Sequence, residues 1–181
     1  PELRGRGDSA YAKDSATYNP YQYVDDINHL LEQAGIERYV ALGTSLGGLM
    51  TMILAMNAPE RIAGALLNDV GPELDPAGLA RIAAYVGQGR SFPTWMHAAR
   101  AMEETQGIAH PGFRIEDWLA MAKRMMTLSS NGRIVFDYDM KIAEPFTRAS
   151  PNPQPDFWPG LEALANRPVL ILRGAVSDLL T

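Results

Sequence analysis

Short continuous runs of apolar residues, each typical of a buried strand, occur at residues 39–42, 62–67 and 168–172. Between the first two runs, residues 49–56 form a longer apolar stretch that predicts a helix. A strand, a helix and a second strand in this order indicate a βαβ unit and, with it, a parallel sheet. The pattern therefore predicts an α/β fold.

A further helix is predicted immediately before the first strand. Apolar residues recur three and four positions apart from Ile27 to Ala34, Asp25 or Asp26 can cap this helix, and Gly35 is placed to end it. Residues 10–24 are polar and rich in tyrosine, and we expect them to be irregular.

The rhythm of the sequence changes after residue 72. Helices are predicted to begin near Asp75, near Pro93 and near Glu116, and among them only residues 134–136 resemble a strand. Five of the nine methionines lie between Met96 and Met126. Because methionine fills irregular apolar space, this segment is interpreted either as an apolar lid over a substrate pocket or as ordinary helical core.

These patterns predict three parts. Residues 1–72 form a core segment, residues 73–150 a helical cap inserted between core strands, and residues 151–181 a return to the core that carries the last strand. The proline-rich residues 149–159 are expected to form the return connection.

The most informative motif follows the first strand, where Gly43, Ser45 and Gly47 form a G-x-S-x-G pattern. A strand, a tight turn and a helix with a serine at the apex are the context of a nucleophile elbow. We expect glycine to be required at both flanking positions, because Cβ atoms there would collide in so tight a turn. Gly48 would let the helix pack close to the strand.

Ser45 is the predicted nucleophile, since a serine hydroxyl must be exposed and aimed to react. The backbone N–H of Leu46 lies at the start of the helix and can point at an oxyanion beside Ser45, where the helix N-terminus adds partial positive charge. Leu46 is therefore the predicted donor of one half of an oxyanion hole.

Two aspartates follow predicted strands and are candidates for the carboxylate that orients a histidine. Enzymes with parallel sheets work at the carboxyl ends of their strands, and Asp178 lies there, as Ser45 does. We expect Asp178 to be the acid, with Asp69 as the competing candidate. The plainer interpretation of Asp178 is that it caps the next helix.

Composition limits the remaining possibilities. The chain has 181 residues, enough for one domain with a sizeable core, and its net charge of −5 argues against nucleic acid as the main partner. It contains no cysteine, so a thiolate metal site is excluded, and nothing in the sequence implies a metal or organic cofactor. No apolar run is long enough to span a membrane, and no signal-peptide pattern opens the chain. We therefore expect a cytoplasmic protein that acts on a small molecule; its oligomeric state stays open.

Four segments together resemble the α/β-hydrolase superfamily, in particular its lidded serine esterases and lactonases. They are the loop 3–9, the elbow 43–48, the stretch 59–72 and the stretch 168–178. The resemblance implies a parallel-sheet α/β-hydrolase fold with a helical cap. It also implies that Ser45 is the nucleophile and Asp178 the triad acid, with the Leu46 N–H as an oxyanion donor. The same resemblance interprets Arg6-Gly7-Asp8, a tripeptide also found in integrin ligands, as part of a common loop.

The sequence departs from the family pattern at the histidine. The family order is serine, acid, histidine, whereas His29, His97 and His110 all precede Asp178. The His-Gly loop that supplies the second oxyanion donor would precede Pro1. We therefore expect an internal fragment of a longer protein, with its N- and C-terminal parts missing and little activity alone.

For the complete protein, the sequence predicts a serine hydrolase that cleaves a small, mainly apolar ester or lactone through an acyl-enzyme. A serine at the elbow argues against dehalogenases and epoxide hydrolases, which use aspartate there. Two alternatives stay open: a carbon–carbon bond hydrolase on the same scaffold, and a non-catalytic binding protein of this fold. Adhesion through Arg6-Gly7-Asp8 would require that loop to be exposed.

Overall fold

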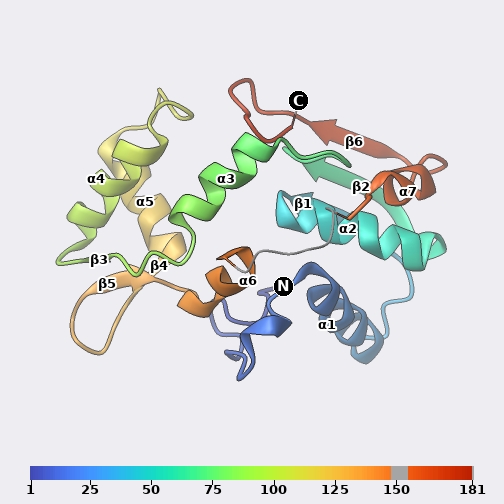
Figure 1. Cartoon of the computed structure of the whole chain (residues 1–181), viewed down its shortest axis with the longest axis horizontal. Helices are drawn as coiled ribbons and strands as arrows, with labels where there is room; N and C mark the ends of the chain where they lie inside the picture. Colours follow the sequence, from blue (N-terminus) through green and yellow to red (C-terminus); the bar gives the residue numbers. More distant parts are fainter. Residues whose placement is uncertain (148–154, 181) are drawn as a thin grey trace.

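The computed structural model describes residues 1–147 and 155–180. Its centre is a parallel sheet in the order β1-β2-β6 (Figure 1). The strands are β1 (Tyr39–Thr44), β2 (Ile62–Asn68) and β6 (Val169–Leu172). They coincide with the three apolar runs, so the predicted parallel sheet is confirmed. The predicted connection at 149–159 lies partly outside the described residues.

Helix α2 (Leu46–Asn57) forms the centre of the main core. It follows β1 directly, and it contacts both β1 and β2 as well as α1 (Pro20–Gln33) and α7 (Trp158–Ala163). The residues of α2 from Met50 to Ala55 are all buried, which explains why this helix is apolar on every side. A Cβ on Gly160 of α7 would lie 2.4 Å from the Met52 carbonyl oxygen, so these two helices touch through their backbones.

Only one face of the sheet is covered by the described residues. Ala41, Leu67 and their neighbours on that face pack towards α2, whereas Val40 and Leu42 on the other face are 71% and 74% exposed. Leu170 and Leu172 of β6 are exposed on the same side as Val40 and Leu42. Ile171 of β6, which is in register with Leu67, is also 46% exposed. The prediction that these strands are buried is therefore wrong for one face of β1 and for most of β6. Apolar runs of this kind are typical of parallel strands covered on both faces.

Helix α1 begins earlier than the sequence predicts. Its N-cap is Asn19, whose side chain accepts a hydrogen bond from the Gln22 amide, and Pro20 is the first helical residue. The expectation of irregular structure is therefore wrong from residue 20 onward. Asp25 and Asp26 lie inside the helix and so do not cap it, and the Asp26 carboxylate pairs with Arg4.

Residues 91–136 form a second group of elements with a core of its own (Figure 1). Helices α4 (Trp95–Gln106) and α5 (Ile115–Met125) pack together beside an antiparallel sheet. The order in that sheet is β3-β5-β4, with β3 at Ser91–Phe92, β4 at Met126–Leu128 and β5 at Ile134–Phe136. The sequence indicated only β5, because two- and three-residue strands carry too few residues for a pattern.

Two helices lie between these groups in the chain. Helix α3 (Pro76–Tyr85) begins after the N-cap Asp75, as predicted, and lies between the parallel sheet and α4 and α5 in Figure 1. Helix α6 (Glu144–Thr147) follows a short 3-10 helix, η3 (Met140–Ala143). Two further 3-10 helices are η1 (Ser15–Thr17) and η2 (Pro59–Arg61).

The N-terminal loop is tied to the segment that follows β5. The Asp139 amide donates to the Gly5 carbonyl at 2.8 Å, and the Gly7 amide donates to the Asp137 carbonyl at 3.1 Å. The Arg6 guanidinium lies over the ring of Tyr23, 5.3 Å from its centre. Arg6 is therefore held against the protein, whereas adhesion through Arg6-Gly7-Asp8 requires an exposed loop.

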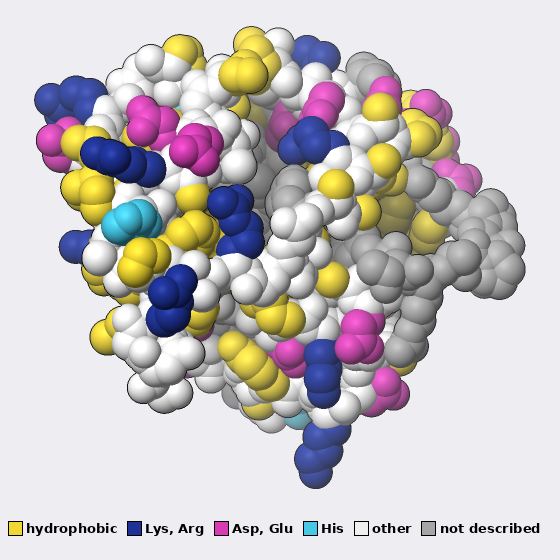
Figure 2. Space-filling view, turned by 60° about the vertical axis from the view of Figure 1, so that its left-hand side comes forward, with side chains coloured by type: hydrophobic (Ala, Val, Ile, Leu, Met, Phe, Trp, Pro, Cys, Tyr) yellow, Lys and Arg dark blue, Asp and Glu magenta, His cyan; other side chains and the backbone are white. Residues whose placement is uncertain are grey.

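The methionine-rich segment is largely a packed core. Trp118, Met102 and Met126 are 1%, 3% and 4% exposed, while Met96 and Met125 reach the surface. Figure 2 shows this side of the molecule, where hydrophobic side chains are interspersed with Lys and Arg. Among the described residues, no helix has the length and apolar character that crossing a membrane requires.

Candidate active site

The three parallel strands end side by side, and this edge carries the candidate residues. Thr44, Asn68 and Leu172 are aligned in register across β1, β2 and β6. Beyond them the Ser45 amide donates to the Asn68 carbonyl at 3.0 Å, and the Asp69 amide donates to the Leu172 carbonyl at 2.7 Å. Ser45 and Asp69 therefore lie at the ends of neighbouring strands, where parallel sheets commonly place their sites.

Ser45 has the backbone of a tight strand-to-helix turn. Its φ of 50° and ψ of −116° lie in a region that residues with a side chain rarely occupy. Within the described part of the chain, the Ser45 side chain makes no capping hydrogen bond to α2. A strained serine between a strand and an apolar helix is the geometry expected of an elbow.

The glycines around Ser45 differ in whether a side chain would fit at their positions. A Cβ on Gly43 would lie 2.4 Å from the carbonyl carbon and oxygen of Gly47, so only glycine fits at position 43. A Cβ on Gly48 would lie 2.2 Å from the Val70 side chain, in the loop after β2, and 3.4 Å from the Gly43 carbonyl oxygen of β1. Glycine at position 48 therefore lets α2 pack close to both. A Cβ on Gly47 would meet no described residue within 4 Å, so the expected steric need for glycine is wrong there.

Leu46 is the first residue of α2, directly after Ser45. Backbone N–H groups in the first turn of a helix have no acceptor within the helix, and the aligned peptide dipoles add partial positive charge there. An anion beside Ser45 would thus meet a positive helix end.

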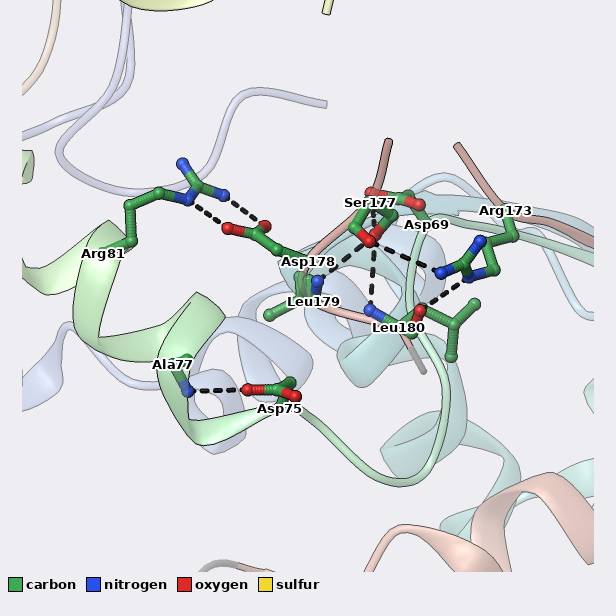
Figure 3. Close-up of polar contacts among 9 residues, drawn as sticks. All are labelled: Asp69, Asp75, Ala77, Arg81, Arg173, Ser177, Asp178, Leu179 and Leu180. Atoms are coloured by element: carbon green, nitrogen blue, oxygen red, sulfur yellow. Dashed lines mark hydrogen bonds and ion pairs between the residues drawn. The ribbon is translucent and has the colours of Figure 1, made fainter. Parts of the chain in front are cut away.

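Asp178 lies in the loop after β6 and forms an ion pair with Arg81 of α3 (Figure 3). Arg81 donates from Nε and Nη2 to the two carboxylate oxygens, at 2.5 and 2.7 Å. This bidentate hydrogen bond is the main reason why the pKa of Asp178 is lowered. The Asp178 side chain is 48% exposed, so the pair is open to solvent.

Asp69 is held by the same loop. Its Oδ1 accepts from the Gly174 amide at 2.8 Å. Its Oδ2 accepts from the Ser177 hydroxyl at 3.0 Å (Figure 3). Its φ of 56° is in the left-handed region, which aspartate tolerates better than most residues. Both aspartates considered as the acid are therefore on this edge, and the structure gives them different partners.

The three histidines are engaged elsewhere. His29 bonds Gln33 on the surface of α1, and His97 bonds Thr94 at the start of α4. His110 stacks on Phe113, with ring centres 4.5 Å apart. Within the described part of the chain, none of them is bonded to Ser45 or to Asp178.

A hollow of about 630 Å³ is lined by residues of the N-terminal loop and of α1, not by Ser45 or Asp178. Residues 1–147 and 155–180 contain no group of three or more His, Cys, Asp or Glu side chains that could hold a metal ion.

Sequence reasoning missed two participants at this edge, Arg81 and Ser177. Arg81 lies on a helix 97 positions before Asp178, and nothing local in the sequence connects the two. Ser177 is adjacent to Asp178, and a hydroxyl that precedes a candidate acid was the only signal available.

Comparison with known proteins gives consistent matches. The chain is 62% identical to an alpha/beta hydrolase of known crystal structure from Novosphingobium aromaticivorans, over all of this chain and 64% of that one, with a TM-score of 0.94. It is 33% identical to a 3-hydroxybutyrate-oligomer hydrolase from Cupriavidus necator, over 99% of this chain and 63% of that protein. The chain thus spans somewhat under two thirds of the length of these relatives.

A more distant structural neighbour is an esterase from Mycobacterium tuberculosis, with 24% identity and a TM-score of 0.62 over 97% of this chain and 56% of that one. At this identity the likeness shows the fold alone. The family model described as alpha/beta hydrolase fold matches residues 1–114, which is more than half of the sequence. With its parallel sheet and strained serine turn, the chain belongs to the alpha/beta hydrolase fold family.

Proposed function

We propose that the whole protein is a carboxylic ester hydrolase that uses Ser45 as its nucleophile. The observation that carries this proposal is the backbone of Ser45, with φ of 50° at the junction of β1 and α2. Strain of this kind persists only where the surrounding structure enforces it, and it is concentrated at functional sites. Here Gly43 and the buried helix α2 enforce it.

In the proposed reaction, Ser45 Oγ attacks the substrate carbonyl carbon while a histidine accepts the hydroxyl proton. The Leu46 N–H and a second donor stabilise the oxyanion, and the histidine then protonates the leaving alcohol. Water hydrolyses the acyl-enzyme by the same steps in reverse. Asp178 orients the histidine. Because His29, His97 and His110 all have partners elsewhere, we propose that the base comes from a part of the whole protein outside these 181 residues.

The proposed substrates are small, mainly apolar esters or lactones. The similarity to a 3-hydroxybutyrate-oligomer hydrolase supports an ester bond and makes short hydroxyacid oligomers the first compounds to test.

The test is labelling with a fluorophosphonate probe, which reacts only with an activated serine. The polypeptide is used at its natural length, and the adduct is mapped by mass spectrometry. We expect an adduct on Ser45 that is lost in Ser45→Ala and kept in Ser130→Ala, an exposed serine in a turn. Hydrolysis of 3-hydroxybutyrate dimers, simple short-chain esters and lactones is then compared. A folded protein without an adduct on Ser45 would contradict the proposal and favour a non-catalytic binding protein.

A further inference from the structure

Asp69 lies between the serine turn and the loop that carries Asp178. The Ser45 amide donates to the carbonyl of Asn68, the last residue of β2, and the amide of the next residue, Asp69, donates to the Leu172 carbonyl of β6. The Asp69 carboxylate points to the loop after β6, as Figure 3 shows. Asp69 is thus the residue directly after β2, and it links the ends of β2 and β6.

Both carboxylate oxygens of Asp69 are used by that loop. Oδ1 accepts from the Gly174 amide at the start of the loop, at 2.8 Å. Oδ2 accepts from the Ser177 hydroxyl, directly before Asp178, at 3.0 Å. A Cβ on Gly174 would lie 3.3 Å from Oδ1, so the loop backbone lies close to the carboxylate.

Ser177 connects Asp69 to the residues that follow Asp178. Its Oγ accepts hydrogen bonds from the Leu179 and Leu180 amides, each at 3.3 Å. A hydroxyl has one hydrogen and two lone pairs, so a Ser177 that donates to Asp69 keeps both lone pairs for the two amides. The backbone is therefore anchored immediately before and after Asp178.

Arg173 closes the loop from its other side. Its Nε donates to the Leu180 carbonyl at 2.7 Å, and Nη2 donates to the Ser177 carbonyl at 3.4 Å (Figure 3). The loop also rests on α3, where a Cβ on Gly78 would lie 2.3 Å from the Asp178 carbonyl oxygen. The backbone of Asp178 is therefore held on both sides, and this restricts the positions that the Asp178 carboxylate can reach.

We propose that Asp69 is a positioning residue for Asp178, which it holds at the strand-end edge through Ser177 and Gly174. The proposal rests on the proposed function, in which Asp178 orients the histidine. It assigns different roles to the two aspartates: Asp178 faces the reaction, and Asp69 supports the loop behind it. The alternative is that Asp69 is itself the acid.

A carboxylate is specifically suited to this position. Asn at 69 could still accept from the Gly174 amide, but its NH₂ group would face a Ser177 oxygen whose lone pairs already accept two amides. The Ser177 hydroxyl would then have to turn and release one of them. Asp69→Asn therefore changes the loop without changing the size of the side chain.

The test uses the natural-length protein with Asp69→Asn, Ser177→Ala, their combination and Asp178→Asn. Asp25→Asn on the exposed face of α1 is the matched control, and Ser177→Thr keeps the hydroxyl. We expect Asp69→Asn to lower kcat about 10- to 100-fold with little change in KM, as removal of an orienting group behind a functional ligand commonly does. Asp178→Asn should cost about 10⁴-fold.

Three readouts separate positioning from a merely structural role. In Asp69→Asn the rising limb of the pH profile of kcat/KM should move to lower pH, because a displaced Asp178 stabilises the protonated histidine less. The double variant should lose no more than the stronger single variant, since both act through one contact. Ser177→Thr should restore activity that Ser177→Ala loses.

Two results would overturn the inference while the proposed function stands. An active wild type whose Asp69→Asn variant keeps its kcat and pH profile would show that Asp69 positions nothing. An Asp69→Asn variant as inactive as Asp178→Asn, or more so, would make Asp69 the acid. A folded wild type without turnover would overturn both proposals. Urea unfolding of the single and double variants would then measure only how much the Asp69–Ser177 contact contributes to stability.

Discussion

Gly43 and Gly47 approach each other so closely that a Cβ on Gly43 would lie 2.4 Å from the Gly47 carbonyl group, yet a Cβ on Gly47 would meet none of the residues that the structure describes within 4 Å. The motif therefore contains one glycine that the packing of strand on helix requires. It also contains one for which the packing gives no reason.

This asymmetry predicts opposite effects on stability. Gly43→Ala should lower the free energy of unfolding by about 1–3 kcal/mol, as overpacking at a rigid contact does. Gly47→Ala lies in the first turn of α2 and should be neutral or stabilising by up to about 1 kcal/mol, because alanine favours the helix. Urea unfolding of both variants measures the difference. Equal destabilisation would contradict the geometry of this turn.

The two faces of the sheet predict a second contrast. Leu67 is 0% exposed and packs in the main core, so Leu67→Ala should cost about 2–5 kcal/mol. Leu42 is 74% exposed in this chain, and Leu42→Ala should change the stability of the 181-residue protein by no more than about 0.5 kcal/mol. Thermal and urea unfolding provide the measurement. A large loss at Leu42 would mean that its face is covered in solution.

The Arg81–Asp178 pair predicts a pH effect with a defined sign. Arg81→Met should raise the pKa of the Asp178 carboxyl toward its ordinary value, because the bidentate hydrogen bond to the ionised form is lost. Carboxyl-carbon NMR titration measures this pKa, with Arg100→Met on the surface of α4 as the control.

The same pair contributes stability only while Asp178 is ionised. Because the folded-state pKa is lowered, the contribution is present above the ordinary carboxyl pKa of about 3.9 and is lost as the pH falls through the lowered value. The stability difference between wild type and Arg81→Met should therefore shrink on acidification. A difference that grows at low pH would contradict the pairing.

A fourth prediction concerns the isolated chain of 181 residues. Its three histidines have partners away from Ser45, so we expect turnover far below that of the natural-length protein. Loss of the base alone lowers kcat by about 10⁶-fold in a serine hydrolase. Parallel ester assays on the two polypeptides, both checked for folding by circular dichroism, provide the test. Equal turnover would mean that one of these three histidines serves as the base.

Local chemistry made much of the molecule predictable. The three apolar runs became the parallel strands, and the helices of residues 73–130 begin close to the expected positions. The start of α1 was missed because Asn19-Pro20, a good N-cap and first residue, lies in a polar segment without an apolar period. The strands β3 and β4 were missed because such short segments form only where a partner strand is present.

The turn at Ser45 follows from local sequence, because strand, glycine, serine and apolar helix are consecutive along the chain. The surroundings of the two aspartates depend instead on long-range packing. Arg81 reaches Asp178 across 97 positions, and Ser177 reaches Asp69 across 108. Long-range packing also sets which face of the sheet α2 covers. An apolar run shows that burial of the strand is favourable. The element that covers the strand is set by the packing of segments distant in sequence.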